Sequence, residues 1–234
     1  MTLARDRLIV ALDVPNVEQA KALIEALGDS VGVYKIGLEL LFSGGFALAQ
    51  ELALHGRPVF VDAKLLDIEA TVERATAAIA RMGVAFLTVH ALDNKTLAAA
   101  VRGRGDSPLK LLGVTVLTNL APADLIEQGC DHPLAELALH RAKLAKEAGF
   151  DGVIASGHEA AKIRNAAGPD FLIVTPGVRP QGAATQDQAR AVTPASAIEA
   201  GADYLVVGRP ITCAADPRAA AEAIVAEIDA ALSR

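Results

Sequence analysis

Aromatic side chains are scarce in this chain: they make up 3% of its 234 residues, although 52% of the residues are hydrophobic. A core with so few rings must be built from Ala, Val, Leu and Ile, which is typical of helices packed against buried parallel strands. The sequence also lacks any uninterrupted apolar stretch near the roughly 20 residues that a transmembrane helix needs. We therefore expect an α/β protein that is not embedded in a membrane.

The chain also has only two cysteines and fewer basic than acidic residues. The two cysteines, Cys130 and Cys213, stand alone, without the spacing that indicates a disulfide framework or a metal site. A net charge of −6 argues against a nucleic-acid surface. The first residues carry charge at Arg5, Asp6 and Arg7 instead of the apolar segment of a secretory signal. These absences predict a cytoplasmic protein that holds any anionic ligand with a few local cations.

The chain does contain a regular alternation of short apolar runs and amphipathic or Ala-rich stretches. The expected strands are Leu8–Leu12, Val31–Ile36, Val59–Ala63, Phe86–Val89, Leu111–Leu117, Gly152–Ala155, Phe171–Val174 and Tyr204–Val207. The expected helices include Val17–Leu27, Ala70–Met82, Thr96–Arg102, Leu134–Ala148, His158–Ala166, Ala195–Ala200 and Pro217–Leu232.

No linker or change of composition interrupts these eight units, so they predict a single (β/α)8 TIM barrel domain over residues 1–234. A doubly wound open sheet is the alternative. Such sheets usually carry a glycine fingerprint after the first strand, where this chain has Asp13-Val14-Pro15-Asn16.

The most informative feature is a cluster of charge at the end of the third expected strand, where Asp62, Lys64 and Asp67 follow an apolar run. Burying charged groups this close together is costly unless they satisfy one another, and such clusters point to proton or charge chemistry. Asp62 and Lys64 project to the same side and meet if the strand extends that far. Spacing leaves open whether Asp67 folds back or reaches another subunit. A purely structural ion network is the alternative.

Other polar residues also fall at expected strand ends, where TIM barrels place their active sites. Lys35 interrupts an apolar strand, and a buried lysine needs a carboxylate partner. Asp13 lies at the end of the first strand, but turn chemistry before Pro15, with Asn16 capping the next helix, explains it equally well. His90 has no second ligand at metal spacing, so we interpret it as structural.

The ends of the last two strands indicate a phosphate site. Gly177 and Arg179 follow the seventh strand, and Gly208 and Arg209 follow the eighth. TIM barrels often bind phosphate with these two loops, where glycine lets backbone N–H groups approach and arginine supplies paired donors. Arginines on a solvated rim are the alternative for either one alone. The long segment 175–192 is expected to be either disordered or a functional lid.

Together these residues resemble the orotidine 5′-monophosphate decarboxylase family, in its bacterial type. The shared motifs cover essentially the whole chain in order: Ala11-Leu12-Asp13, Tyr34-Lys35-Ile36-Gly37, Asp62-x-Lys64-x-x-Asp67-Ile68, Val114–Thr118, Thr175–Arg179, Asp187-Gln188-x-Arg190, Thr193-Pro194 and Gly201–Thr212. The resemblance implies decarboxylation of orotidine 5′-monophosphate to UMP in de novo pyrimidine biosynthesis. It also implies a homodimer with no metal or organic cofactor and no nucleic-acid or membrane partner.

The resemblance implies catalytic roles for the charged cluster. Lys64 would donate a proton to C6 of the pyrimidine, and Asp62 would press against the substrate carboxylate. Lys35 and Asp67 would complete the charged array. In the homodimer, Asp67 and Thr71 would come from the partner subunit.

The resemblance also implies the contacts that bind the rest of the nucleotide. Asp13 would hold a ribose hydroxyl, and Thr118 would meet the pyrimidine edge. The groups expected at the phosphate, partly in a closing lid, are Arg179, Gln188, Gly208 and Arg209.

The chain departs from the family pattern at a few positions. Leu66 stands where histidine is common, Glu69-Ala70 replace Pro-Asn, and Asn119 follows Thr118 where serine is frequent. Since the charged residues and Thr71 remain, we expect altered packing at the helix start and unaltered chemistry.

Two other functions compete with the decarboxylase. Magnesium-dependent relatives that act on 3-keto-gulonate 6-phosphate or hexulose 6-phosphate share the barrel and the Asp-x-Lys-x-x-Asp cluster. A catalytically silent nucleotide-binding barrel with a regulatory role is the second. The Val114–Thr118 setting and the long segment after Arg179 favour the nucleotide substrate over the sugar phosphate, and the complete charged array speaks against a silent barrel.

Overall fold

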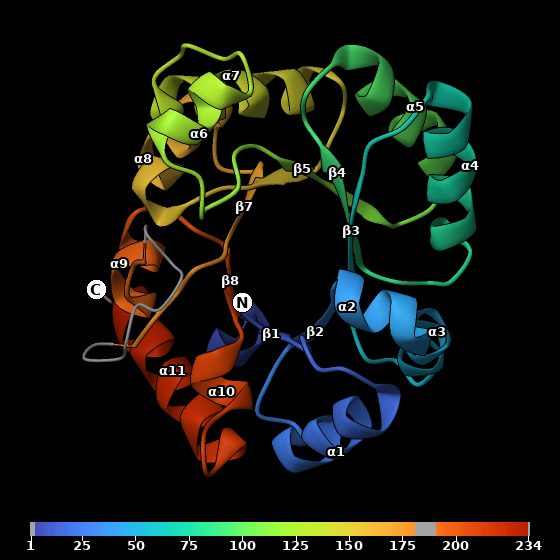
Figure 1. The fold of residues 1–234 in the computed structure, drawn as a ribbon. Helices are drawn as coiled ribbons and strands as arrows, with labels where there is room; N and C mark the ends of the chain where they lie inside the picture. The colour runs from blue at the N-terminus through green and yellow to red at the C-terminus, as the bar shows by residue number, and fades with distance from the viewer. Residues whose placement is uncertain (1–2, 181–190, 234) are drawn as a thin grey trace.

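Eight parallel strands close into a barrel in the computed structural model, which describes residues 3–180 and 191–233. The strands follow one another around the barrel in chain order, and β1 pairs with both β2 and β8. Figure 1 looks into the barrel and shows the helices as an outer ring. The strands are β1 (Leu8–Ala11), β2 (Val33–Ile36), β3 (Val59–Leu65), β4 (Phe86–His90), β5 (Lys110–Val114), β6 (Gly152–Ile154), β7 (Leu172–Thr175) and β8 (Tyr204–Val207). The predicted (β/α)8 TIM barrel is confirmed.

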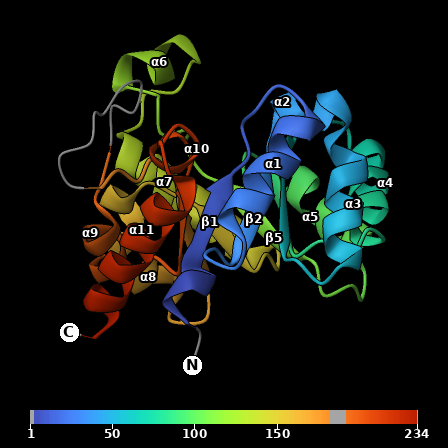
Figure 2. The same cartoon turned by 90° about the horizontal axis from the view of Figure 1, so that it is seen from below.

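A helical segment follows each strand. The segments are a 3₁₀ turn (Ala4–Arg7) before β1, α1 (Val17–Leu27), α2 (Leu38–Leu40), a π-helical turn (Leu41–Gly45), α3 (Phe46–Leu54), α4 (Glu69–Ala80), α5 (Asn94–Arg104), α6 (Pro122–Glu127), α7 (Leu134–Glu147), α8 (Gly157–Ala167), α9 (Pro194–Glu199), α10 (Arg209–Thr212) and α11 (Pro217–Leu232). In Figure 2, α2, α6 and α10 lie at one end of the barrel and both labelled termini at the other. No helix within the described ranges is long and apolar enough to cross a membrane.

Two apolar layers form the core. The larger fills the space between strands and helices with mostly aliphatic side chains, and the smaller fills the barrel interior. Three of the eight aromatic residues lie in the interior, where Phe86 packs edge-on against Phe60 and Tyr204 with ring centroids 6.0 Å and 5.4 Å apart. These three rings fill part of the barrel interior, and Phe60 also lines the cavity described below.

Three strands, β2, β3 and β5, differ from the predicted bounds by two residues or more at one end. Strand β2 begins at Val33, directly after Gly32, which packs so closely against the 3₁₀ turn that a Cβ there would lie 2.4 Å from the Cα of Asp6. Strand β5 ends at Val114, after which both the N–H and the hydroxyl of Thr115 donate to the Ile154 carbonyl at the end of β6. Strand β3 runs on to Leu65, two residues beyond the predicted end at Ala63, and therefore includes both Asp62 and Lys64.

Helix caps fix two of the loops at the carboxyl end of the barrel. The Asn16 side chain accepts a hydrogen bond from the Gln19 N–H at 2.9 Å, as predicted for the start of α1. Asp93 caps α5 in the same way, through the Thr96 N–H at 2.8 Å. These caps set where each helix begins and therefore the path of the loop after β1 and β4.

Candidate active site

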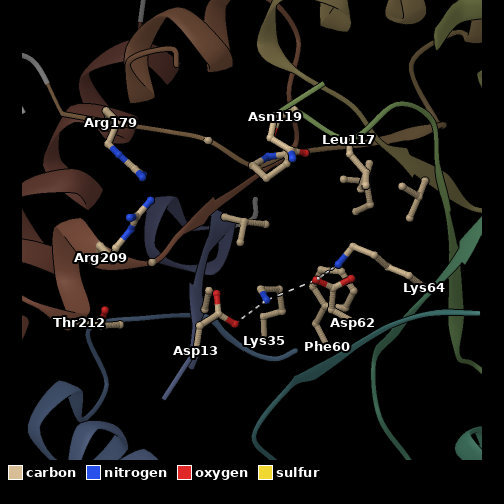
Figure 3. Close-up of a pocket in the computed structure, with 18 of the residues that line it drawn as sticks. Asp13, Lys35, Phe60, Asp62, Lys64, Leu117, Asn119, Arg179, Arg209 and Thr212 are labelled. Carbon is tan, nitrogen blue, oxygen red and sulfur yellow. Dashed lines mark hydrogen bonds and ion pairs between the residues drawn. The ribbon is translucent and has the colours of Figure 1, made fainter. Parts of the chain in front are cut away.

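A cavity of about 400 Å³ opens at the carboxyl ends of the strands. Its lining residues are Ala11, Asp13, Lys35, Phe60, Asp62, Lys64, Val114, Val116, Leu117, Thr118, Asn119, Ile154, Pro176, Gly177, Arg179, Val206, Gly208, Arg209 and Thr212. Figure 3 shows four charged residues in one row, from Asp13 through Lys35 and Asp62 to Lys64, and two arginines on the side away from Lys64. The fold thus gathers most of the predicted site residues around one space.

The row alternates in sign and every neighbouring pair is in contact. The Lys35 ammonium lies 3.0 Å from Asp13 Oδ1 and 3.3 Å from Asp62 Oδ2. The Lys64 ammonium lies 2.8 Å from the same Asp62 oxygen. Lys35 and Asp62 are each only 8% exposed, so these interactions operate in a medium that screens charge poorly. Because Asp13 contacts Lys35, it belongs to the charged row and does not serve only the turn before Pro15.

Burial and neighbouring charges act in opposite directions on the two buried members of the row. Burial alone would lower the pKa of Lys35, but the carboxylates of Asp62 and Asp13 outweigh it and hold that pKa above its ordinary value. Burial alone would raise the pKa of Asp62, but the Lys35 and Lys64 ammonium groups and a hydrogen bond from Thr88 hold it below its ordinary value. Both groups therefore stay charged at neutral pH.

Strand β3 is irregular where it delivers these groups. Its pairing with β4 shifts register between Val61 and Leu65, and Lys64 has a left-handed backbone with φ of 48°. Such a bulge re-aims side chains at barrel rims and active sites. The predicted meeting of Asp62 and Lys64 is confirmed, but through this bulge and not through the alternation of a regular strand.

Gly37 makes room for the pair at the other end of the row. A Cβ at this position would lie 2.9 Å from both Asp13 Oδ1 and Lys35 Nζ. Sequence reasoning did not single out Gly37 as a site residue. A glycine two positions after a strand-borne lysine was the available indication, because it allows polar atoms to approach the backbone closely.

Arg179 and Arg209 face the opposite side of the cavity. Arg179 is 7% exposed and donates to the Val178 carbonyl at 3.0 Å. Burial first, and then the nearby positive charge of Arg209, lower the pKa of Arg179. Gly177 adopts the left-handed region with φ of 75°, and Gly208 is the N-cap of α10. Two guanidinium groups brought together in this way favour a multiply charged anion such as phosphate.

The loop after β5 supplies the remaining polar wall. Thr118, which was predicted, and its neighbour Asn119 both line the cavity, beside the apolar Val116 and Leu117. Thr212 at the end of α10 also lines it (Figure 3). Asn119 and Thr212 were not among the predicted site residues. Loop residues like these are hard to find from the sequence because no strand or helix periodicity marks the direction of their side chains.

Two predicted residues, Asp67 and Thr71, are not brought into this cavity. Asp67 is exposed, and its carboxylate accepts a hydrogen bond from the adjacent Ile68 N–H at 2.6 Å. Thr71 is half-buried in the first turn of α4, and neither residue lines the cavity of its own subunit. Gln188 lies outside the described residues. The chain therefore does not fold Asp67 back onto Lys64.

His90 ends β4 and is half-buried outside the cavity lining. Burial, followed by the positive charges of Lys64 and Arg141, lowers the pKa of His90. Within residues 3–180 and 191–233, no group of three or more His, Cys, Asp or Glu side chains is placed to hold a metal ion.

Comparison with known proteins gives the family. The model of the Orotidine 5'-phosphate decarboxylase / HUMPS family matches residues 6–224. The chain is 55% identical over 224 residues to "Orotidine 5'-phosphate decarboxylase" of Rhodopseudomonas palustris (strain BisB5), covering 96% of this chain and 95% of that protein. For the protein of the same name from Methylobacterium nodulans, the identity is 54% over 230 residues, with 97% of each chain covered. The crystal structure of orotidine 5'-phosphate decarboxylase from Lactobacillus acidophilus superposes with a TM-score of 0.83 at 42% identity, covering 95% of this chain and 98% of that one. This chain belongs to the Orotidine 5'-phosphate decarboxylase / HUMPS family.

Proposed function

We propose that this chain is a single-domain cytoplasmic enzyme that converts orotidine 5′-monophosphate to UMP and carbon dioxide in pyrimidine biosynthesis. The observation that carries the proposal is the row of alternating charges that ends at Lys64, set across one cavity from Arg179 and Arg209. The substrate has the same layout, with a phosphate at one end and a carboxylate on the pyrimidine ring at the other. Close relatives carry the name of this activity.

Lys64 is the proposed proton donor. The bond from C6 to the carboxylate breaks, carbon dioxide leaves, and the electron pair stays on C6. The Lys64 ammonium then gives a proton to C6, and the neutral amine takes a proton back from solvent. The carbanion at C6 has little delocalisation, so a fixed positive charge beside it stabilises the transition state. Lys64 suits this role because it lines the cavity and Asp62 holds its ammonium at 2.8 Å.

Asp62 and Lys35 prepare the place where the carboxylate leaves. We propose that Asp62 lies against the substrate carboxylate. Repulsion between the two negative charges then destabilises the bound substrate more than the neutral carbon dioxide that leaves. The Lys35 ammonium lies 3.3 Å from Asp62 and keeps that carboxyl group charged. Lys35 also contacts Asp13, which we propose binds a ribose hydroxyl. The charged row then orients the Lys64 ammonium, the substrate carboxylate and the ribose before the carboxylate leaves.

The far side of the cavity is assigned to the phosphate. Arg179, Arg209 and the backbone at Gly208 would hold it, with Gln188 from the segment outside the described residues. Thr118 is assigned to the pyrimidine edge. Phosphate contacts remote from C6 supply binding energy that orders the charged row, without touching the reacting carbon.

We also propose a homodimer that covers the face beside Asp67. Exposed apolar side chains cluster on the segments after β2, β3 and β4, including Phe42 at 86% and Ile68 at 72% exposure. The remaining members of this face are Leu38, Phe46, Leu66 and Leu92. Apolar patches of this kind mark protein interfaces. A second copy seated here would cover them and bring its Asp67 and Thr71 toward the neighbouring cavity, whose own Asp67 is turned away.

The activity is tested with purified protein and orotidine 5′-monophosphate, by following the loss of substrate absorbance. We expect turnover in the presence of a chelator, its loss in Lys64→Ala, and its retention in Lys21→Ala, which removes a half-exposed lysine paired with Glu51. A wild-type protein without turnover, with or without added metal, overturns the assignment. Turnover that disappears with chelator favours the metal-dependent sugar-phosphate relatives.

The shared site is tested by mixing two inactive variants, Lys64→Ala and Asp67→Ala. In a mixed dimer, one cavity receives both mutations and the other receives neither. Random exchange at equal amounts makes about half of the dimers mixed, so about a quarter of wild-type activity should return. If Asp67 serves its own subunit, mixing restores nothing.

A further inference from the structure

Lys64 has an unusual backbone for a residue with a side chain. Its φ of 48° is the one positive φ outside glycine among residues 3–180 and 191–233. The left-handed region is unfavourable for residues that carry a Cβ, and it persists only where the surroundings enforce it. The proposed proton donor therefore sits on backbone that something must hold in place.

Thr88 makes the contacts that can hold it. This residue of β4 is fully buried, and its hydroxyl accepts a hydrogen bond from the Lys64 N–H at 3.0 Å. The same hydroxyl donates to Asp62 Oδ1 at 2.8 Å. A hydroxyl has one proton to give and lone pairs to accept, so both bonds exist together. Thr88 thus ties the strained backbone of one charged residue to the carboxylate of the other.

The bond from Thr88 to Oδ1 of Asp62 leaves the second oxygen, Oδ2, for the two lysines. Asp62 uses Oδ2 for the ammonium groups of Lys64 at 2.8 Å and Lys35 at 3.3 Å. With Oδ1 fixed by Thr88, the carboxylate cannot rotate about its last bond without losing a buried hydrogen bond. The direction of the Lys64 ammonium is then set by two anchors, one on its backbone and one on its partner.

The position of Thr88 on its strand strengthens the case. Its neighbours Leu87 and Val89 belong to the apolar layer under the helices, whereas Phe86 belongs to the barrel interior. Alternation along β4 places Thr88 on the interior side, where TIM barrels usually carry bulky apolar side chains. Thr88 does not line the cavity, so it has no contact there with a ligand.

We infer that Thr88 is a positioning residue, which sets the Asp62 carboxylate and the left-handed Lys64 backbone so that the lysine ammonium is aimed at the reacting carbon. This inference rests on the proposed decarboxylase function for its kinetic consequence and on the geometry alone for its structural one. The two consequences can be tested separately.

The test removes the hydroxyl and keeps the shape. Thr88→Val deletes both hydrogen bonds at nearly constant volume, and Thr88→Ala deletes them with less bulk. Thr88→Ser keeps the hydroxyl. The matched control is Thr76→Val, because Thr76 is also fully buried and its hydroxyl has no hydrogen-bond partner among the described residues.

We expect kcat to fall about 10- to 100-fold in Thr88→Val and Thr88→Ala, because misplacement of a catalytic group by about 1 Å costs on that order. The KM for orotidine 5′-monophosphate should change less than about threefold, since Thr88 does not itself line the binding cavity. Thr88→Ser should retain kcat within about threefold, and the Thr76→Val control should match wild type. An equal fall in Thr76→Val, or a Thr88→Val variant with wild-type kcat, overturns the inference.

Crystal structures of wild type and Thr88→Val give the structural readout. We expect the Asp62 carboxylate to rotate or the φ of Lys64 to leave the left-handed region in the variant. Unchanged geometry at both residues overturns the inference whatever the activity. A wild-type enzyme without turnover would instead refute the decarboxylase function, and the structures would still decide the role of Thr88.

Discussion

Replacing Asp62 with asparagine should destabilise the folded protein, because it removes the only negative charge between two ammonium groups in the row. The amide oxygen can still accept the hydrogen bond from Thr88, so the change is confined to the other oxygen. At that position an NH₂ group would face Lys35 and Lys64, which are donors themselves. The variant therefore loses two charge-assisted contacts and places an amide donor against two ammonium donors.

The size of the effect follows from burial. Breaking a fully buried ion pair costs about 3–5 kcal/mol. The Asp62 and Lys35 side chains are 11% and 10% exposed, but Lys64 is 28% exposed and Lys35 keeps Asp13 at 3.0 Å. We therefore expect a loss of about 2–4 kcal/mol in the free energy of unfolding. For a chain of this size, that corresponds to a fall of about 4–16 °C in Tm.

The difference between wild type and Asp62→Asn should also depend on pH. The folded-state pKa of Asp62 lies below its ordinary value of 3.8, so its contribution is fully present above that value and is lost as pH falls through the folded pKa. The pKa of Lys35 lies above 10.5, so its contribution is present below that value and is lost only as pH rises through the folded pKa. The stability gap should be constant near neutral pH and close in strong acid.

Urea unfolding followed by circular dichroism, between about pH 3 and pH 8, measures the gap. The control is Glu51→Gln, which removes a half-exposed pair with Lys21 and should cost less than about 1 kcal/mol at every pH. An Asp62→Asn variant as stable as wild type, or more stable, would refute the reasoning. It would mean that the cost of removing the buried charges from water outweighs the attraction between them.

Three further predictions concern other parts of the molecule. Gly37→Ala should fold, because the atoms 2.9 Å from the new Cβ are ends of flexible side chains, but displacing Asp13 and Lys35 should lower kcat/KM about 10- to 100-fold in steady-state assays. Arg209→Ala should raise the KM for orotidine 5′-monophosphate about 10- to 100-fold with a smaller change in kcat, and equal affinity for inorganic phosphate in both proteins would contradict a phosphate role. Gly32→Ala should lower stability by about 1–3 kcal/mol in urea unfolding, because its Cβ meets backbone 2.4 Å away, while activity per folded molecule stays unchanged.

Much of the fold was predictable because parallel strands in a barrel are apolar on both faces and the helices between them are amphipathic. Helices α1 and α11 have their predicted bounds of Val17–Leu27 and Pro217–Leu232, since Asn16 and Asp216 cap them and both are marked in the sequence. The short helices α2 and α10 were not predicted. Segments of three or four residues carry too little periodicity to be recognised.

The site was predictable where it depends on strand ends. Because all parallel strands point the same way, polar residues at their carboxyl ends must meet, and Asp13, Lys35, Asp62 and Lys64 do so. Residues that act by holding a site residue in place, and that do not lie at a strand end, gave no comparable indication in the sequence. Thr88 lies in the middle of an apolar strand, and only the bulge in β3 brings the Lys64 N–H to its hydroxyl.

The sequence by itself determined the barrel, its order of strands and the identity of the charged groups, because periodicity and strand-end chemistry are properties of neighbouring residues. Only the tertiary structure decided how those groups pair. It set the left-handed backbone at Lys64, the sharing of Asp62 between two lysines and the outward direction of Asp67. These features depend on distances between strands and on a register shift, and both are fixed when the barrel closes.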